Sequence, residues 1–277
     1  MKKLSKFATI LLAVGFVLSA FTGCPDASGT TNGTNGNSGS GTYIGTKAPS
    51  EAKAVGDIVF SDGSATPYTS GLTLTNEQKS KAVAVIFYAG SASDTLGAKT
   101  LGVGLENATG DGNTLAWARL TNSDDKAEGY STDITAIQCT TADGETEAAT
   151  ATFTGDLDGS DNWQALCDTV SDEGTSGNYP AWEWVNAYAT TANLTGNYAS
   201  GWYLPTVAEL SMLYRAKDTV NSALEKAGGT KIADAYYWSS SQSASLIKYA
   251  WYVKFDDNNL SLLNKNYALS VCTVRAF

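Results

Sequence analysis

The side chains that most enzymes use for acid–base and nucleophilic chemistry are scarce in this chain, which has no histidine among its 277 residues. Without histidine, neither a Ser-His-Asp triad, a Cys-His pair nor an HExxH zinc site can form. No GxGxxG or Walker-type phosphate loop occurs either. The sequence therefore predicts no catalytic residue, no cofactor and no enzyme activity.

One acidic segment, Asp156–Asp161, has the density of side-chain oxygens that a calcium loop needs. It lacks the ligand spacing and the terminal Glu of an EF-hand loop, and the chain contains no Glu-Pro-Asn or Gln-Pro-Asp run of the calcium lectins. We therefore favour a solvated turn that leads into a helix cap and predict no metal site. Calcium binding is the alternative.

The C-terminal segment combines an aromatic frame with apolar residues that follow no regular period. The run Tyr249–Phe255 predicts a strand with Trp251, Val253 and Phe255 on one face. Asp256–Asn259 is a turn signal, and the leucines after it are scattered among asparagines. Irregular loops lie at the surface, so these apolar side chains predict a contact surface. A loop folded over the core is the alternative.

The genetic code provides a further test of this segment. Randomising the two adenines of an Asn codon (AAC or AAT) yields Ser, Leu, Ile, Tyr, Asp, Ala, Cys and others, but never Lys, Trp, Gln, Glu, Met or a stop codon. The residues that break the regular pattern all belong to the accessible set. Gln242, Trp251 and Lys265 do not, and they stand within the frame.

Four runs carry a recognisable pattern, namely Tyr237–Ser241, Ala250–Phe255, Val274–Phe277 and Gly201–Leu210. The first three resemble the C-terminal variable repeat of proteins diversified by diversity-generating retroelements, and the fourth resembles the Gly-Trp-Arg-Leu-Pro-Thr segment of the same family. The resemblance implies an α+β fold, the C-type lectin fold of the formylglycine-generating-enzyme type. Such a fold is loop-rich, with short strands and about three helices, and its first and last strands pair.

By this resemblance, residues 237–277 are a variable region whose mutated positions bind a ligand. The predicted variable patch consists of Ser245, Leu246, Ile247, Tyr252, Asp257, Ser261, Leu262, Leu263, Asn264, Asn266, Tyr267, Ala268, Leu269 and Cys272. All of these except Asn266 and Cys272 are expected on one exposed face. Trp238, Trp251, Val253 and Phe255 are expected to form the frame beneath them.

The cysteines argue against activity of the formylglycine-generating type. Formylglycine-generating enzymes work through a pair of reactive cysteines near the C-terminus, where this chain has only Cys272. Cys139 and Cys167 could form a disulfide in an exported protein. Cys167 stands on an apolar helix face, however, where a buried free thiol is common, and both states stay open.

The N-terminus has the layout of a bacterial lipoprotein signal. Lysines precede an apolar run, Ala8–Ala20, that is too short to span a membrane. Phe21–Cys24 resembles a lipobox, which predicts a signal peptide over residues 1–23 and lipidation of Cys24, with a plain signal peptide as the alternative. Residues 24–51 are rich in Gly, Ser, Thr and Asn and predict a flexible tether.

The net charge of the chain and the residue after Cys24 limit the kinds of binding partner and the cellular location that we expect. The net charge of -10 argues against nucleic acid, whose phosphates require a basic surface. Pro25 rather than Asp follows Cys24, so the inner-membrane retention signal is absent and we expect an outer-membrane, lipid-anchored protein at the cell surface. The anchor is its only expected membrane contact, and the expected partner is a protein or glycan on another cell or host surface.

Residues 52–277 show no break in composition and predict one domain. The expected strands are Val55–Phe60, Lys81–Tyr88, Thr100–Leu105 and Thr114–Leu120. Helices are expected from Asp161 or Asn162, from Pro180, and from Thr206 to the cap at Gly228, with Thr206 and Glu209 spaced as a capping box. Strands at both ends with helices between them indicate an α+β domain. Thr121–Gly159 is interpreted as an insertion.

The tryptophans allow two interpretations. Those near the ends of elements could stack on carbohydrate, but in a loop-rich domain they are more often part of the core. The set is Trp182, Trp184, Trp202, Trp238 and Trp251. We favour the core.

Together these features predict a surface-displayed, ligand-binding lipoprotein that presents a variable patch. A fixed-sequence adhesin or structural lipoprotein of the envelope is the first alternative. An enzyme of the formylglycine-generating type is the second, and it is less favoured because Cys272 has no partner cysteine nearby in the sequence.

Overall fold

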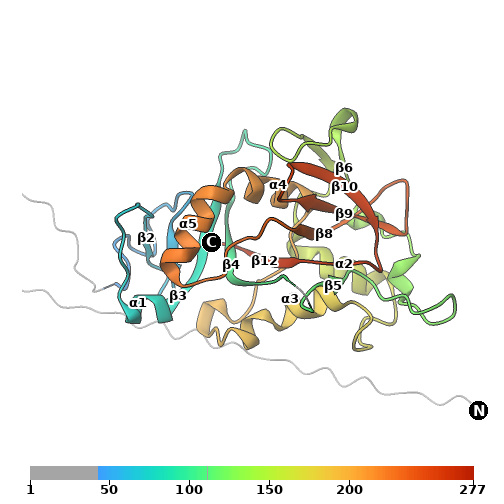
Figure 1. Ribbon diagram of the computed structural model, residues 1–277, viewed down its shortest axis with the longest axis horizontal. Helices are drawn as coiled ribbons and strands as arrows, with labels where there is room; N and C mark the ends of the chain where they lie inside the picture. The colour runs from blue at the N-terminus through green and yellow to red at the C-terminus, as the bar shows by residue number, and fades with distance from the viewer. Residues whose placement is uncertain (1–42, 111) are drawn as a thin grey trace, which may run out of the picture. The chain divides into compact units, whose positions relative to one another are not determined.

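The computed structural model describes residues 43–110 and 112–277 (Figure 1). The predicted signal peptide, the lipidation site at Cys24 and the tether up to residue 42 lie outside the described residues. The folded unit takes in Lys47, which bridges to Ala65, so it begins before the boundary expected at residue 52. Within the described ranges, no helix is both long and apolar enough to cross a bilayer.

Short strands and helices of moderate length make up the folded unit. The strands are β1 (Ile58–Phe60), β2 (Ala65–Thr66), β3 (Ala82–Ala89), β4 (Thr100–Ala108), β5 (Leu115–Ala116), β6 (Cys139–Thr141), β7 (Phe153–Gly155), β8 (Tyr236–Gln242), β9 (Tyr249–Lys254), β10 (Asn259–Asn264), β11 (Ala268–Leu269) and β12 (Val271–Ala276). The α-helices of the described residues are α1 (Asn76–Lys81), α2 (Asn162–Thr169), α3 (Pro180–Thr191), α4 (Val207–Arg215) and α5 (Lys217–Ala227). The α+β class is therefore confirmed.

The helix count differs from the sequence expectation of about three. The short helix α1 has no buried residue, so its sequence carries no apolar stripe that could reveal it. The expected third helix is two helices, because the backbone leaves the helical conformation at Ala216. Of the expected strand Thr114–Leu120, only Leu115–Ala116 forms a strand, β5, while Leu120 makes an isolated bridge to Lys126.

The larger sheet has the order β12-β4-β3-β1-β2, and all its neighbouring strands are antiparallel. The expectation that Val55–Phe60 pairs with Val271–Phe277 is wrong, because β3 and β4 lie between them, although both runs belong to this sheet. The reason is the apolar run in β3, which is buried on both faces and therefore takes a central position.

Helices cover both faces of this sheet. Ile58 and Phe60 belong to the core cluster that α4 and α5 complete, whereas Val59 belongs to the cluster that includes Tyr188 of α3. This alternation along β1 follows from the two-residue period of a strand. The sheet is thus a rigid layer between helices.

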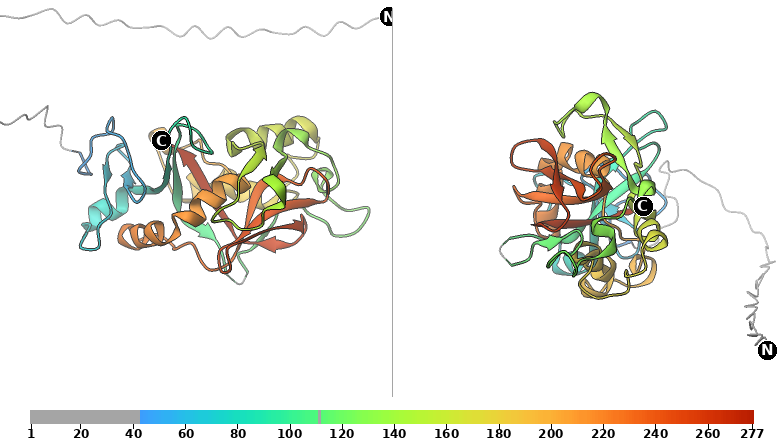
Figure 2. Two further views of the ribbon diagram at one scale, coloured as in Figure 1. Left: turned by 90° about the horizontal axis from the view of Figure 1, so that it is seen from above. Right: turned by 90° about the vertical axis from the view of Figure 1, so that its right-hand side faces the viewer.

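The smaller sheet carries the segment of interest. It has the order β10-β9-β8, and Figure 2 shows these C-terminal strands, drawn in red, beside the green segment 112–150. The bridge between Glu147 and Asn259 and the pairing of β11 with β5 make this contact. The expected insertion Thr121–Gly159 is part of the packing, since Ile134 and Ile137 are buried in the cluster beneath the sheet.

The capping box predicted for α4 is confirmed. The Glu209 N–H donates to the Thr206 hydroxyl at 3.1 Å, and the Thr206 N–H donates to the Glu209 carboxylate at 2.8 Å. Gly228 ends α5 with a φ of 81°, a left-handed conformation that glycine adopts without strain. These caps fix the ends of the helix pair that packs on the large sheet.

Thr206→Ala is expected to lower the free energy of unfolding by about 1 kcal/mol, because the buried N-terminus of α4 loses its side-chain cap. Chemical denaturation measures this change. The matched control is Thr75→Ala, which removes the same kind of cap from α1, a helix without buried residues. If Thr75→Ala lowers the free energy of unfolding as much as Thr206→Ala does, this account is contradicted. It is also contradicted if Thr206→Ala lowers the free energy of ligand binding more than the free energy of unfolding.

Candidate functional site

The sheet β10-β9-β8 is the frame of the candidate site. Tyr237 and Val253 lie opposite each other and pack into the main core, together with Leu260. On the other face, Trp238 lies opposite Tyr252 and packs into the second cluster. The sheet is therefore held from both sides, which limits how far its side chains can be exposed.

The serines that follow Trp238 each have a structural partner. The Ser239 hydroxyl donates to the Trp251 carbonyl at 2.7 Å, and the Ser240 hydroxyl accepts from the Asn162 amide at 2.8 Å. The Ser241 hydroxyl accepts from the backbone N–H of Val207 at 3.0 Å, at the N-terminus of α4. All three serines are fully buried, so this run ties β8 to β9, α2 and α4.

Lys265 and Trp251, two of the residues that the codon argument excludes, are tied into the protein in the same way. Lys265 is fully buried, and its Nζ donates to the Gly129 carbonyl at 2.7 Å and to the Gln242 side-chain oxygen at 3.2 Å. Burial lowers the pKa of Lys265 to about 7. The Trp251 indole donates to the Cys139 carbonyl at 2.8 Å. These contacts hold the C-terminal segment against segment 129–139.

The predicted variable patch divides into three groups. The exposed members are Ser245, Leu246, Ile247, Asp257, Tyr267 and Ala268. The half-buried members are Ser261, Leu262, Leu263, Asn264 and Asn266. The buried members are Tyr252, Leu269 and Cys272, and the expectation that Tyr252 and Leu269 are exposed is wrong.

These differences have two causes: the expected irregular loop is largely strand, and other segments of the core cover the three buried members. Residues 259–264 form β10 and pair with β9, so their side chains alternate between the faces of the sheet. Tyr252 is covered because it packs against Trp238, with ring centroids 6.1 Å apart. Leu269 pairs with Leu115 in the second cluster. Cys272 lies in β12 among core residues, and burial raises its pKa to about 12.

The expected frame is largely confirmed. Trp238, Val253 and Phe255 are buried, and Trp251 is half-buried against the main core. The turn predicted after β9 is also present. It runs through Asn258, whose positive φ of 63° is a conformation that asparagine tolerates.

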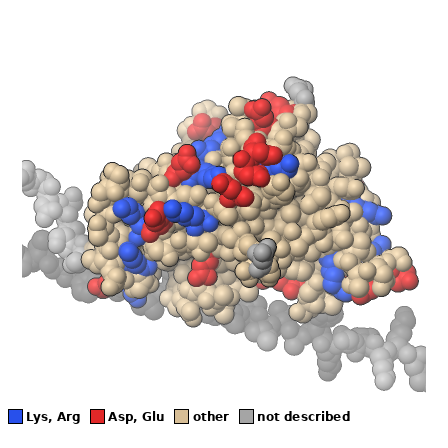
Figure 3. Space-filling model, viewed as in Figure 1, with Lys and Arg blue, Asp and Glu red and all other residues tan. Residues whose placement is uncertain are grey.

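Exposed apolar side chains concentrate on the C-terminal segment. Among the described residues, six large apolar side chains are well exposed, and four of them are Tyr236 (38%), Leu246 (48%), Ile247 (37%) and Tyr267 (57%). Figure 3 shows a wide area without charged residues right of centre on the face that it draws, while both signs of charge mix elsewhere. A contact surface at this end of the molecule is consistent with that distribution.

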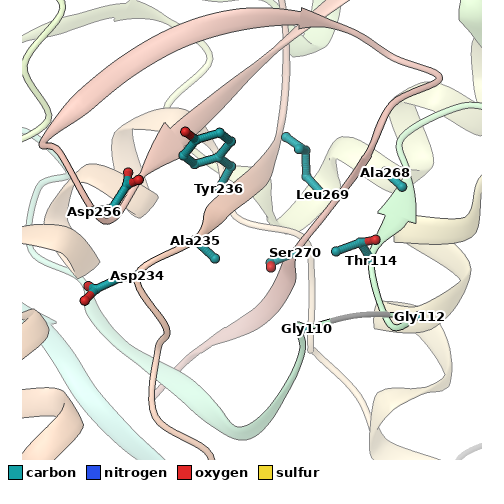
Figure 4. Close-up of a pocket in the computed structure, with 10 residues that line it drawn as sticks. All are labelled: Gly110, Gly112, Thr114, Asp234, Ala235, Tyr236, Asp256, Ala268, Leu269 and Ser270. Atoms are coloured by element: carbon teal, nitrogen blue, oxygen red, sulfur yellow. The ribbon is translucent and has the colours of Figure 1, made fainter.

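A cavity of about 420 Å³ opens beside the patch (Figure 4). Tyr236 and Leu269 face the same space in Figure 4, with Asp256 beside Tyr236. The Lys254 Nζ lies over the Tyr236 ring, 5.3 Å from its centroid. The lining residues are Gly110, Gly112, Thr114, Asp234, Ala235, Tyr236, Asp256, Ala268, Leu269 and Ser270.

Two more cavities adjoin the patch. One of about 420 Å³ lies between Asn266, Lys248 and the segment Leu120–Tyr130. A smaller one, of about 220 Å³, is formed by Ser245–Tyr249 alone. The surface around the patch therefore contains several open hollows, of which the one beside Asn266 is lined mainly by polar residues. Such a surface suits a partner protein or a flexible ligand.

Several lining residues were missed by sequence reasoning. Tyr236 could have been found, because in a strand it must lie on the face opposite to buried Tyr237. Thr114 and the segment 120–130 could not, because contacts between distant parts of the chain bring them to the patch, such as the pairing of β5 with β11 and the bond from Lys265 to Gly129.

The other chemical candidates have structural roles. Cys139, Cys167 and Cys272 are free thiols, so the disulfide considered for Cys139 and Cys167 is not formed. Asp158 caps the turn at Ser160 and forms an ion pair with Lys99 at 2.7 Å. Within the described ranges, no group of three or more acidic or cysteine side chains is arranged to hold a metal ion.

Comparison with known proteins defines the class. Residues 108–275 match the model of the Lcl C-terminal domain family, and the chain therefore belongs to this family. The match supports the resemblance of this chain to the variable proteins of diversity-generating retroelements. A search of the curated proteins finds no match.

Among solved structures, the chain is similar to a fimbrial protein from Bacteroides ovatus, with a TM-score of 0.52 and 15% sequence identity. The similarity covers 81% of this chain and 49% of that protein, so this chain spans about half its length. At this identity the likeness concerns the fold alone. The family and this fold fit a variable surface-binding protein, and neither description names an enzyme activity.

Proposed function

We propose that the chain binds ligands at the cell surface through the exposed part of the variable patch. The observation that carries the proposal is the concentration of exposed apolar side chains, Leu246, Ile247 and Tyr267, on a segment whose frame is buried and hydrogen-bonded. Exposed apolar groups on a rigid support can anchor a partner without a large entropic cost. The ligand class is a protein or a glycan on another cell or on a host surface.

We further propose that adenine-directed mutagenesis from a retroelement template diversifies this patch. Gln242, Trp251 and Lys265, which such mutagenesis cannot produce, are the positions whose side chains hold the frame. Variation elsewhere would change the surface and spare these contacts. Buried Tyr252, Leu269 and Cys272 are expected to accept fewer substitutions than the exposed positions. A near-copy of the coding sequence for residues 237–277, differing at adenines and lying beside a reverse transcriptase gene, would support the proposal.

The finer fold assignment belongs to this proposal as well. The C-type lectin fold of the formylglycine-generating-enzyme type is supported by the capping box at Thr206 and by the bridge between Tyr203 and Val274, which joins the Gly201–Leu210 segment to the last strand. The lipid anchor at Cys24, the tether and the outer-membrane position are proposed from the sequence. Mass spectrometry of the mature N-terminus tests the anchor directly.

A fixed adhesin or structural component of the envelope is the second candidate, favoured by the fold shared with a fimbrial protein. The two candidates differ in one observable property. A fixed protein has the same patch residues in every cell of a population, whereas a diversified one differs at the accessible codons.

Replacing Leu246, Ile247 and Tyr267 together with Ser is expected to weaken binding by a factor of about 100, because three exposed anchors at about 1 kcal/mol each contribute about 3 kcal/mol to a partner contact. The measurement is binding of the full chain, displayed on beads, to a panel of intact cells and immobilised glycans. The melting temperature is expected to stay within a few degrees of the parent, because these side chains are exposed.

The matched control replaces Tyr43 and Val55 with Ser. These two residues are also large, apolar and exposed, at 44% each, but they lie outside the C-terminal segment. The control variant is expected to bind as the parent does. The proposal fails if the patch variant retains full binding, or if the control variant loses as much.

A further inference from the structure

A second concave site lies between α2, α3 and the segment Gly201–Leu204, and none of its residues belongs to the variable patch. It has a volume of about 250 Å³. The lining consists of Gly159, Ser160, Trp163, Gln164, Trp182, Val185, Asn186, Gly201, Trp202, Tyr203 and Leu204. We call it the tryptophan cleft.

The aromatic walls of the tryptophan cleft are held in place. The Trp202 indole donates to the Tyr198 carbonyl at 2.8 Å, and the Tyr203 hydroxyl donates to the Glu209 carboxylate at 2.9 Å. Trp163, which is half-buried, packs against Trp182 with ring centroids 5.9 Å apart. Because the polar atoms of Trp202 and Tyr203 are already engaged, these two rings offer a ligand rigid apolar surface.

The mouth of the cleft offers hydrogen-bonding groups that the protein leaves free. Ser160, Gln164 and Asn186 are exposed there. Within the described part of the chain, the Ser160 hydroxyl, the Asn186 carboxamide and the Trp163 indole N–H make no hydrogen bond to protein atoms. The Gln164 amide N–H donates to Asp168 at 2.7 Å and leaves its oxygen available. A ligand can therefore find both donors and acceptors at this rim.

The lining contains no charged residue. An anionic ligand would need a cation in the site and a cationic ligand would need a carboxylate, because neither charge is buried cheaply without a partner. A purely apolar ligand would leave the carboxamide and hydroxyl groups of the rim unused. The chemistry that matches is a neutral molecule with an apolar face and hydroxyl groups at its edge.

We propose that the tryptophan cleft binds a neutral saccharide. The C–H face of one sugar ring lies on the Trp163 indole, and its hydroxyl groups pair with Asn186 and Ser160. This site is independent of the proposed function, since it uses α2 and α3 and leaves the variable patch free. Proteins that differ in the variable patch would then share the same weak sugar site in the tryptophan cleft.

Saturation-transfer NMR and tryptophan fluorescence titration of the full chain test the proposal. The probes are glucose, galactose, mannose, N-acetylglucosamine and their common disaccharides, with glucuronic acid as the charged comparison. At least one neutral sugar is expected to bind with a Kd of about 1–10 mM, the range for so small a ligand. Trp163→Phe and Asn186→Ala are each expected to raise that Kd at least about fivefold.

Two variants separate this site from other causes. Trp184→Phe alters a half-buried tryptophan of α3 outside the cleft and is expected to leave the Kd unchanged. The Leu246, Ile247 and Tyr267 variant is also expected to bind the sugar as the parent does. Absence of saturable binding by every neutral sugar overturns the proposal. So does an unchanged Kd in Trp163→Phe and Asn186→Ala, or a loss confined to the patch variant.

Discussion

The free energy of unfolding is expected to fall by about 3 kcal/mol as the pH rises from 4.5 to 7, because of one buried carboxyl group. Burial raises the pKa of Glu209 from 4.5 to about 7. In this window the unfolded chain loses the Glu209 proton while the folded chain keeps it, so stability is full below pH 4.5 and is lost as the pH approaches 7. Urea denaturation at a series of pH values measures the slope.

Glu209→Gln is the matched variant for this effect. Glutamine keeps a side-chain oxygen that can accept from the Thr206 and Gly159 N–H groups, and it does not titrate. The variant is therefore expected to show a nearly flat stability profile between pH 4.5 and 7. An unchanged slope in Glu209→Gln would mean that another group, such as Asp156, whose pKa is also raised by burial, causes the effect.

Stability is expected to rise again above pH 7, by up to about 1.4 kcal/mol per pH unit, because of Lys265. Its pKa is lowered from 10.5 to about 7, so above pH 7 the folded chain holds the neutral amine while the unfolded chain stays charged. The contribution is present above the unfolded pKa and is lost as the pH falls through 7. The rise is best measured between pH 7 and about 8.5. Near pH 9 the cysteines of the unfolded chain ionise, which stabilises the unfolded chain and opposes the rise.

Lys265→Met removes the titrating amine and keeps the apolar stem, so it is expected to abolish the rise between pH 7 and 8.5. The matched control is Lys248→Met, which removes an exposed lysine of the same segment and should keep the rise. Together the two buried groups predict a minimum of stability near pH 7. A monotonic profile across pH 4.5 to 8.5 would refute this combined expectation.

Both titrating groups belong to the support of the variable patch. Glu209 caps the helix whose first N–H bonds to Ser241, and Lys265 joins the patch segment to Gly129. If the proposed diversification occurs, it acts on a surface whose support is fixed by buried hydrogen bonds. Exposed positions can then change with little effect on the packing beneath them.

Much of the fold could be predicted because its signals are local. The capping box of Thr206 and Glu209 and Pro180 as the first residue of α3 depend on backbone geometry within one helical turn. The strand β3 was visible as an uninterrupted apolar run. The short helix α1 and the division at Ala216 carry no comparable signal, and strand order depends on contacts between distant segments.

The candidate site could be predicted in part. Codon accessibility and composition selected the segment, and the exposed residues Leu246, Ile247 and Tyr267 lie where a contact surface was expected. The same reasoning placed Leu269 at the surface, because an isolated leucine in an irregular run gives no sign of its strand partner. Its pairing with Leu115, more than a hundred residues away, buries it.

The sequence by itself determined the class of the protein, the caps of its helices and the set of residues that changes at the adenines of an Asn codon cannot produce. The tertiary structure decided which members of the patch reach solvent and that Lys265 is buried against Gly129. The physical reason is that caps and apolar periods act between neighbours in the chain. The exposure of a side chain depends on whichever distant segment folds over it.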